Sequence, residues 1–198
     1  IRNISFKETR TDRRKGSGGR MRMEMVQAKE LIYEKEKFVS GIRLLEQEPE
    51  NALALYELGT CYNYGRGVEA DEEKAGEYFK GSLQIFQDVY ESLTSLEKDK
   101  FLRQYVPYRI AKQYAYGQGV DKDYEQARKY YEEAAGEGNI YAMYSLGNIY
   151  YYGQDVEVSY DQAIQYFNKS AIGGNAYAAY RLASMYEKGV GAAVDQEK

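Results

Sequence analysis

The sequence has no histidine, one cysteine and two prolines among its 198 residues. Because histidine is the common general base near neutral pH and the commonest metal ligand, its absence removes His-dependent catalytic triads and the usual His-based metal sites. The single cysteine, Cys61, excludes an intrachain disulfide and a Cys-based zinc cluster. The composition therefore excludes a disulfide-stapled secreted scaffold, and we expect no metal site and no cofactor.

Long apolar runs are also missing. No stretch approaches the roughly 18–20 consecutive apolar residues of a membrane span, and no secretory signal peptide is visible. We therefore expect no membrane contact and a cytoplasmic location, since a single cysteine is compatible with a reducing compartment. Because the chain begins with Ile1 rather than Met, we expect it to come from a longer protein.

Positive charge is concentrated at the start of the chain. The net charge is −4, but residues 1–22 hold eight Arg or Lys against only Glu8 and Asp12, so the remainder is strongly acidic. An acidic remainder argues against the binding of phosphate groups along it.

Tyrosine and glycine are abundant, at 23 and 19 residues. Many of them recur with a period of 36 residues. Tyr114, Gly117, Ala127 and Tyr130 are followed 36 residues later by Tyr150, Gly153, Ala163 and Tyr166, and a further copy starts at Tyr177. A period in this range, with two helices in each unit, indicates an α-solenoid. The question of function therefore becomes what the surface of the solenoid binds.

The repeats begin after a leading helical segment. Residues 21–48 have apolar residues at helical spacing and predict one long helix, or two with a break near Ser40-Gly41, ended by Pro49. The first repeat then has a helix over residues 52–63, a turn over 64–68, and a second helix for which Asp71 is a plausible N-cap.

An insertion separates the first repeat from the second. Gly65 and Gly117 are 52 residues apart, which exceeds the period by 16. We predict that the second helix of the first repeat continues to about Ser92, and that a new helix begins near Thr94, with Glu97 at capping-box spacing. We also expect Pro107 to kink or break that helix before Tyr108. The insertion could form a binding rim, or it could be a lengthened helix pair without a function of its own.

The chain therefore divides into three parts. Residues 1–20 are a basic flexible segment or linker, and residues 21–50 are a leading helix or helix pair. Residues 51–198 hold the repeats. We place these at 51–92, 94–139, 140–175 and 176–198, the last of which is truncated.

The repeated residues resemble a known family. Repeat one carries Ala54, Leu58-Gly59, Tyr62, Gly65-Arg66-Gly67-Val68 and Asp71, and later copies add an Ala-x-x-Tyr-x-x-x-Ala-Ala-x-x-Gly-Asn segment ending at Asn139. This pattern looks like the Sel1-like repeat, a relative of the tetratricopeptide repeat, over roughly residues 52–198. Repeat three departs from it, with Asp155 in place of the second turn glycine and Ser159 in place of the aspartate. The resemblance implies an all-α, right-handed solenoid that scaffolds protein complexes and binds a peptide or partner domain without enzymatic activity.

The resemblance also implies that the first helix of each repeat lines the concave face. Tyr105, Tyr141 and Tyr177 fall at a position that should face the groove, where they either contact a partner or serve as half-buried spacers. Tyr56, Tyr108, Tyr144 and Tyr180 fall at an aromatic position for which packing is favoured. The residues that we propose as partner contacts are Tyr105, Tyr141, Tyr177, Tyr108, Tyr144, Lys112, Asn148, Tyr116 and Tyr152.

The basic segment offers an alternative function. It is either a solvated linker or an arm that contacts DNA or RNA, in which case the chain is an accessory region of a nucleic-acid-handling protein, for example in plasmid mobilisation. Nucleic acid would then be contacted only through residues 1–22, with Arg10, Arg13, Arg14 and Lys15 as candidate contacts.

Catalysis is not expected. The glycine pairs recur in phase and are not followed by Gly-Lys-Ser/Thr, so they are turn residues rather than a nucleotide-binding loop. Cys61 lies inside a repeat helix, where a small buried residue is favoured over a reactive thiol.

Overall fold

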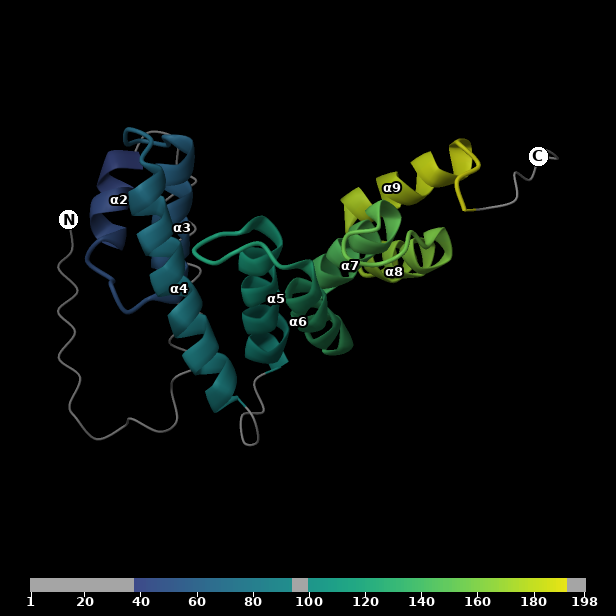
Figure 1. The fold of residues 1–198 in the computed structure, drawn as a ribbon, viewed down its shortest axis with the longest axis horizontal. Helices are drawn as coiled ribbons and strands as arrows, with labels where there is room; N and C mark the ends of the chain where they lie inside the picture. The colour runs from purple at the N-terminus through teal and green to yellow at the C-terminus, as the bar shows by residue number, and fades with distance from the viewer. Residues whose placement is uncertain (1–37, 94–99, 192–198) are drawn as a thin grey trace.

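The computed structural model describes residues 38–93 and 100–191, and every regular element in them is a helix. The helices form an elongated row with α2 at one end and α9 at the other (Figure 1). Their bounds are Phe38–Leu45 for α2, Ala52–Tyr64 for α3, Glu72–Ser92 for α4, Lys100–Tyr116 for α5, Tyr124–Gly136 for α6, Ile140–Tyr152 for α7, Tyr160–Ile172 for α8 and Ala176–Glu187 for α9. The prediction of an all-α solenoid is confirmed.

Short polar side chains begin the helices. The first helices α3, α7 and α9 are capped by Asn51, Asn139 and Asn175, whose side-chain oxygens accept hydrogen bonds from the first free N–H groups. The second helices α4 and α6 are capped in the same way by Asp71 and Asp123. The prediction of Asp71 as an N-cap is therefore confirmed, and each cap satisfies donors that a helix leaves without a partner.

Within a repeat, the two helices pack closely because a glycine lies at their crossing. A Cβ atom built on Gly147 would stand 2.5 Å from the ring of Phe167, which is fully buried. Gly59 meets the ring of Phe79 in the same way, at 2.7 Å. The Leu-Gly pair of the repeat therefore admits the aromatic side chain of the second helix into the core.

The long helix α4 crosses from the first repeat to the second, as Figure 1 shows. Near its end, Gln87 donates a hydrogen bond to the Tyr114 hydroxyl at 3.4 Å, and the Tyr90 ring packs edge-on against Tyr130 at 5.3 Å. The Tyr90 hydroxyl also donates to the carboxylate of Glu133 on α6. The end of α4 at Ser92 agrees with the prediction, and its extension packs on both helices of the next repeat. Thr94 and Glu97 lie outside the described residues.

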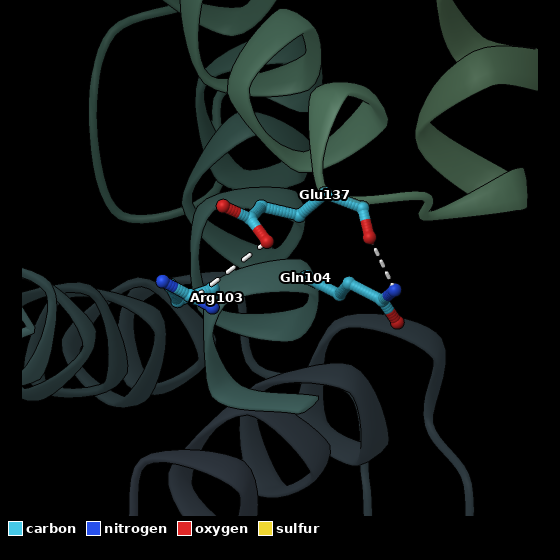
Figure 2. Close-up of polar contacts among 3 residues, drawn as sticks. All are labelled: Arg103, Gln104 and Glu137. Carbon is cyan, nitrogen blue, oxygen red and sulfur yellow. Dashed lines mark hydrogen bonds and ion pairs between the residues drawn. The ribbon is translucent and has the colours of Figure 1, made fainter. Parts of the chain in front are cut away.

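The turn between α6 and α7 is tied to α5. Figure 2 shows Gln104 donating through Nε2 to the backbone oxygen of Glu137, while Arg103 faces the Glu137 carboxylate at 3.6 Å. The carbonyl oxygen of Gln104 in turn accepts from Asn139 Nδ2 at 2.8 Å. Because Asn139 also caps α7, one side chain joins the start of the third repeat to the second.

The sequence allowed helix breaks at Pro107 and near Ser40-Gly41, and the described residues have neither break. The helix α5 continues through Pro107, although a proline there removes the N–H that the Arg103 carbonyl would otherwise accept. Pro107 itself is buried, and its neighbours Val106 and Ile110 are fully buried, so tertiary packing keeps the helix intact. Ser40-Gly41 lies within α2 rather than at a break, and α2 ends at Leu45, before Pro49.

None of the helices in residues 38–93 and 100–191 is both long enough and apolar enough to cross a lipid bilayer. The same residues contain no group of acidic and cysteine side chains arranged to hold a metal ion.

Candidate functional site

A large cavity lies along the first helices. It has a volume of about 1090 Å³, is open to solvent, and is lined by α3, the first half of α4, α5 and the start of α7. Tyr105, Tyr108, Lys112, Tyr116 and Tyr141 all lie in its wall. Five of the predicted partner contacts therefore share one cavity, because four of them lie on α5 and the fifth lies on α7, the first helix of the next repeat.

Arg109 occupies the centre of this cavity. Its side chain is nearly fully buried, and its Nε donates a hydrogen bond to the Tyr105 hydroxyl at 2.7 Å. The guanidinium carbon stands 4.8 Å from the centre of the Tyr105 ring and 4.9 Å from that of Tyr56. Two aromatic faces thus replace part of the hydration of this cation, since an aromatic face attracts positive charge.

Lys112 lies one turn further along α5. Its ammonium nitrogen is 5.5 Å from the centre of the Tyr56 ring and 6.0 Å from that of Tyr116. Burial, together with the nearby positive charge of Arg109, lowers the pKa of Lys112 to about 8. Glu57 acts in the opposite direction, but no carboxylate of the described residues approaches Lys112 within ion-pair distance.

The wall opposite α5 is held in place by polar contacts. The Tyr56 hydroxyl donates to Gln118 Oε1 at 3.1 Å, and burial raises the pKa of Tyr56. Gln113, which is fully buried, donates to the backbone oxygens of Phe79 at 2.7 Å and Gln118 at 3.2 Å. These bonds attach the turn that follows α5 to α3 and attach α5 itself to α4, so the cavity is built jointly by the first two repeats.

A smaller cavity of about 190 Å³ lies one repeat further on, and Tyr116 lines both cavities. Its wall includes Asn148, which occupies the position of Lys112 in the next repeat, and Tyr152. The Asn148 Oδ1 atom is buried and accepts no hydrogen bond. Tyr152 accepts from Arg181 Nη2 at 2.9 Å. Asn148 therefore lines the second cavity while its amide oxygen, turned away from solvent, has no donor.

A tyrosine at the predicted groove position of one repeat contacts a tyrosine at the predicted packing position of the preceding repeat. Tyr108 lies 6.2 Å from Tyr141, and Tyr144 lies 6.4 Å from Tyr177, measured between ring centres. Tyr141 is 56% exposed and Tyr177 is 73% exposed, whereas Tyr105 is half-buried against Arg109. Groove-facing tyrosines thus pack by one edge on the preceding repeat and offer the other side to solvent.

Tyr180 departs from the packing that its position predicts. It is 74% exposed, while Tyr56 at the corresponding position is buried. In the earlier repeats this position is covered by the tyrosine of the next first helix, as Tyr144 is by Tyr177. The described residues end before a helix that would cover Tyr180.

The sequence analysis missed Arg109 and Glu57. A charged residue in a helix usually lies on a solvated face. The 36-residue period does not distinguish Arg109 and Glu57 from the other charged residues of the repeats. A signal was present for Arg109, because it follows Tyr105 by four residues and precedes Lys112 by three, which places all three on one helix face. The candidate nucleic-acid contacts Arg10, Arg13, Arg14 and Lys15 lie outside the described residues.

Solved structures show a similar fold. A Sel1 repeat protein from Oxalobacter formigenes is 19% identical, with a TM-score of 0.54 over 91% of this chain and 70% of its own. The protective antigen c5321 of uropathogenic Escherichia coli, which displays an SLR fold, is 21% identical with a TM-score of 0.46 over 90% and 44% of the two chains. The immunity protein Pa5087 of Pseudomonas aeruginosa is 20% identical with a TM-score of 0.46 over 84% and 71%. No curated protein matches the sequence.

The Sel1 repeat family model matches residues 52–80, 108–139, 140–175 and 176–198. The unmatched stretch 81–107 contains the extension of α4 and the start of α5. The matches cover more than half of the sequence and agree in phase with the 36-residue period. The chain belongs to the Sel1 repeat family.

Proposed function

We propose that the chain is a scaffold that binds an extended segment of another protein along α3, α5 and α7. Sel1 repeats are in general protein–protein interaction scaffolds, and the two cavities are neighbours, since Tyr116 lines both. Both cavities are walled by tyrosine side chains, which offer a large contact area and a hydrogen-bonding hydroxyl at low entropic cost.

The observation that carries the proposal is the unpartnered Oδ1 atom of Asn148. A buried acceptor without a donor costs free energy, and buried polar atoms normally have a partner. Rotation of the Asn148 side-chain amide would turn this oxygen toward the second cavity, where a backbone N–H of a bound peptide would supply the missing donor. Tyr141, exposed in the wall of the neighbouring cavity, would then contact a side chain of the same peptide.

A random octapeptide display library, selected on the immobilised protein, tests the proposal. The affinities of selected peptides are then measured by fluorescence polarisation for the parent, Asn148→Ala and Tyr141→Ala. We expect each variant to bind about tenfold more weakly, as for a contact of about 1.4 kcal/mol.

Tyr186→Ala is the matched control. Tyr186 is 53% exposed on α9 and lines neither cavity. It should leave the affinity unchanged. Unchanged affinity in folded Asn148→Ala and Tyr141→Ala would instead show that the peptides bind elsewhere, and a selection that enriches no peptide would contradict peptide binding.

A further inference from the structure

The charges deep in the larger cavity do not balance. Arg109 and Lys112 are two cations on adjacent turns of α5. Glu57 on α3 is the carboxylate whose negative charge acts on both of them. Glu57 is itself buried, at 7% exposure, and forms no ion pair with either cation within 4 Å. Arg66 and Glu72 also line the cavity and their charges cancel, so the cavity has one positive charge in excess.

The excess is unusual for this chain. Residues 23–198 carry a net charge of −10, because residues 1–22 carry +6 and the whole chain −4. A chain with this balance has many carboxylates that could neutralise a buried lysine. In the described residues, however, Lys112 forms neither an ion pair nor a hydrogen bond, and its ammonium nitrogen lies 5.5 Å and 6.0 Å from the ring centres of Tyr56 and Tyr116. Leaving a half-buried charge without a partner is costly unless a ligand supplies one.

Arg109 also has donors to spare. Its Nε is engaged by Tyr105, but neither of its Nη atoms donates a hydrogen bond to any described residue. The rings of Tyr105 and Tyr56 hold the guanidinium in place, so it is preorganised before any ligand arrives. Lys112, three residues further along α5, places a second cation on the same helix face, so the two cations can contact the two oxygens of one carboxylate.

We propose that the segment bound in this groove is acidic, and that the carboxylate of an aspartate or glutamate side chain lies between Lys112 and Arg109. This inference rests on the proposed function. A carboxylate carries one negative charge and balances the excess, whereas a phosphate group would bring about two charges next to Glu57 and Glu72. A side chain rather than a chain end is favoured because the proposed binding surface continues past Tyr116 into the second cavity.

Peptides from the octapeptide selection, acetylated and amidated at their ends, provide the test. Each selected peptide is resynthesised with every acidic residue changed in turn to its amide, Glu to Gln or Asp to Asn. We expect one such change to weaken binding to the parent about tenfold, and to have no effect on binding to Lys112→Met. Lys112→Arg should retain the preference for the acid, and Lys112→Glu should select peptides with a basic residue at that position.

Lys129→Met is the matched control, because Lys129 is an exposed lysine on α6 outside both cavities. The Lys129→Met variant should prefer the acidic peptide over its amide form by the same factor as the parent. Three results would overturn the inference: selected peptides without an acidic residue, an acid preference that survives in Lys112→Met, or binding that depends only on a free C-terminal carboxylate. Each of these leaves peptide binding itself intact if Asn148→Ala still weakens it. A selection that enriches no peptide would contradict both.

Discussion

Gly119 lies so close to α4 that a Cβ atom built on it would stand 2.3 Å from the backbone nitrogen of Lys80. Its φ is +73°, in the left-handed region that favours glycine. The turn after α5 therefore meets the second helix of the preceding repeat backbone against backbone. This contact sets how closely the turn after α5, which lines the larger cavity, approaches α4.

Gly119→Ala should be more destabilising than Gly117→Ala. Both residues have positive φ, so each substitution incurs a strain of about 1–2 kcal/mol. At Gly117 the nearest atom to the new methyl group would be 3.4 Å away, so strain is the whole effect. At Gly119 the backbone of α4 must also move, and we expect at least about 1 kcal/mol more. Urea denaturation of the two variants measures the difference, and equal losses would show that the close contact is not present in solution.

Lys112→Met should stabilise the protein at pH 7. The pKa of Lys112 is about 8 in the folded protein and about 10.4 in an unfolded chain, so the unfolded state binds more protons between these values. The burial cost of the charge is therefore present in full below pH 8 and is relieved as the pH rises toward 10. We expect the variant to gain about 1–3 kcal/mol at pH 7.

The gain in the free energy of unfolding from Lys112→Met should shrink between pH 8 and pH 10, because Lys112 of the parent loses its proton over this range. Arg109, Glu57 and Tyr64 act on the charge of Lys112 and are the same in both proteins, so the difference between the two stability curves isolates Lys112. A difference that does not change with pH would mean that Lys112 is solvated in the folded state. Guanidinium denaturation across this pH range provides the measurement.

Asn139→Ala should cost more stability than Asn175→Ala. Both asparagines cap a first helix, and the loss of such a cap costs about 1 kcal/mol. Only Asn139 also donates to the preceding repeat, through Nδ2 to the Gln104 carbonyl, whereas Asn175 Nδ2 is buried without a partner. We expect the loss of this hydrogen bond to add about 1 kcal/mol. Thermal unfolding followed by circular dichroism compares the two, and a larger loss for Asn175→Ala would refute the assignment.

Cys61 should be unreactive in the folded protein. Its side chain is 1% exposed, and burial, followed by the charge of Glu57, raises the pKa of the thiol. A thiol-reactive disulfide reagent at pH 8 should therefore modify the native protein at least about a hundredfold more slowly than the protein in 6 M guanidinium, since only the unfolded state presents the thiolate. Fast modification without denaturant would show that α3 opens readily.

Local chemistry was enough to predict most of the helices. The 36-residue period placed the first helices, and the cap at Asp71 follows from a carboxylate that accepts from a free N–H group. The end of α4 near Ser92 follows from the 16 extra residues. Each of these depends on neighbours within a few residues, so the order of residues is sufficient. Pro107 shows where this fails, because burial of Val106 and Ile110 outweighs the local preference to end a helix.

The cavity was decided by tertiary structure. The sequence by itself determined a Sel1-type solenoid and the groove positions of Lys112, Asn148 and Tyr141. It did not determine that Arg109 would lie against the rings of Tyr56 and Tyr105. Nor did it determine that Glu57 and Lys112 would line one cavity without forming an ion pair. The insertion puts the first repeat out of phase with the second, so the face of α3 that meets α5 depends on how α4 packs across both repeats. That packing rests on contacts far apart in the chain, such as Gly119 against Lys80, which no periodic pattern specifies.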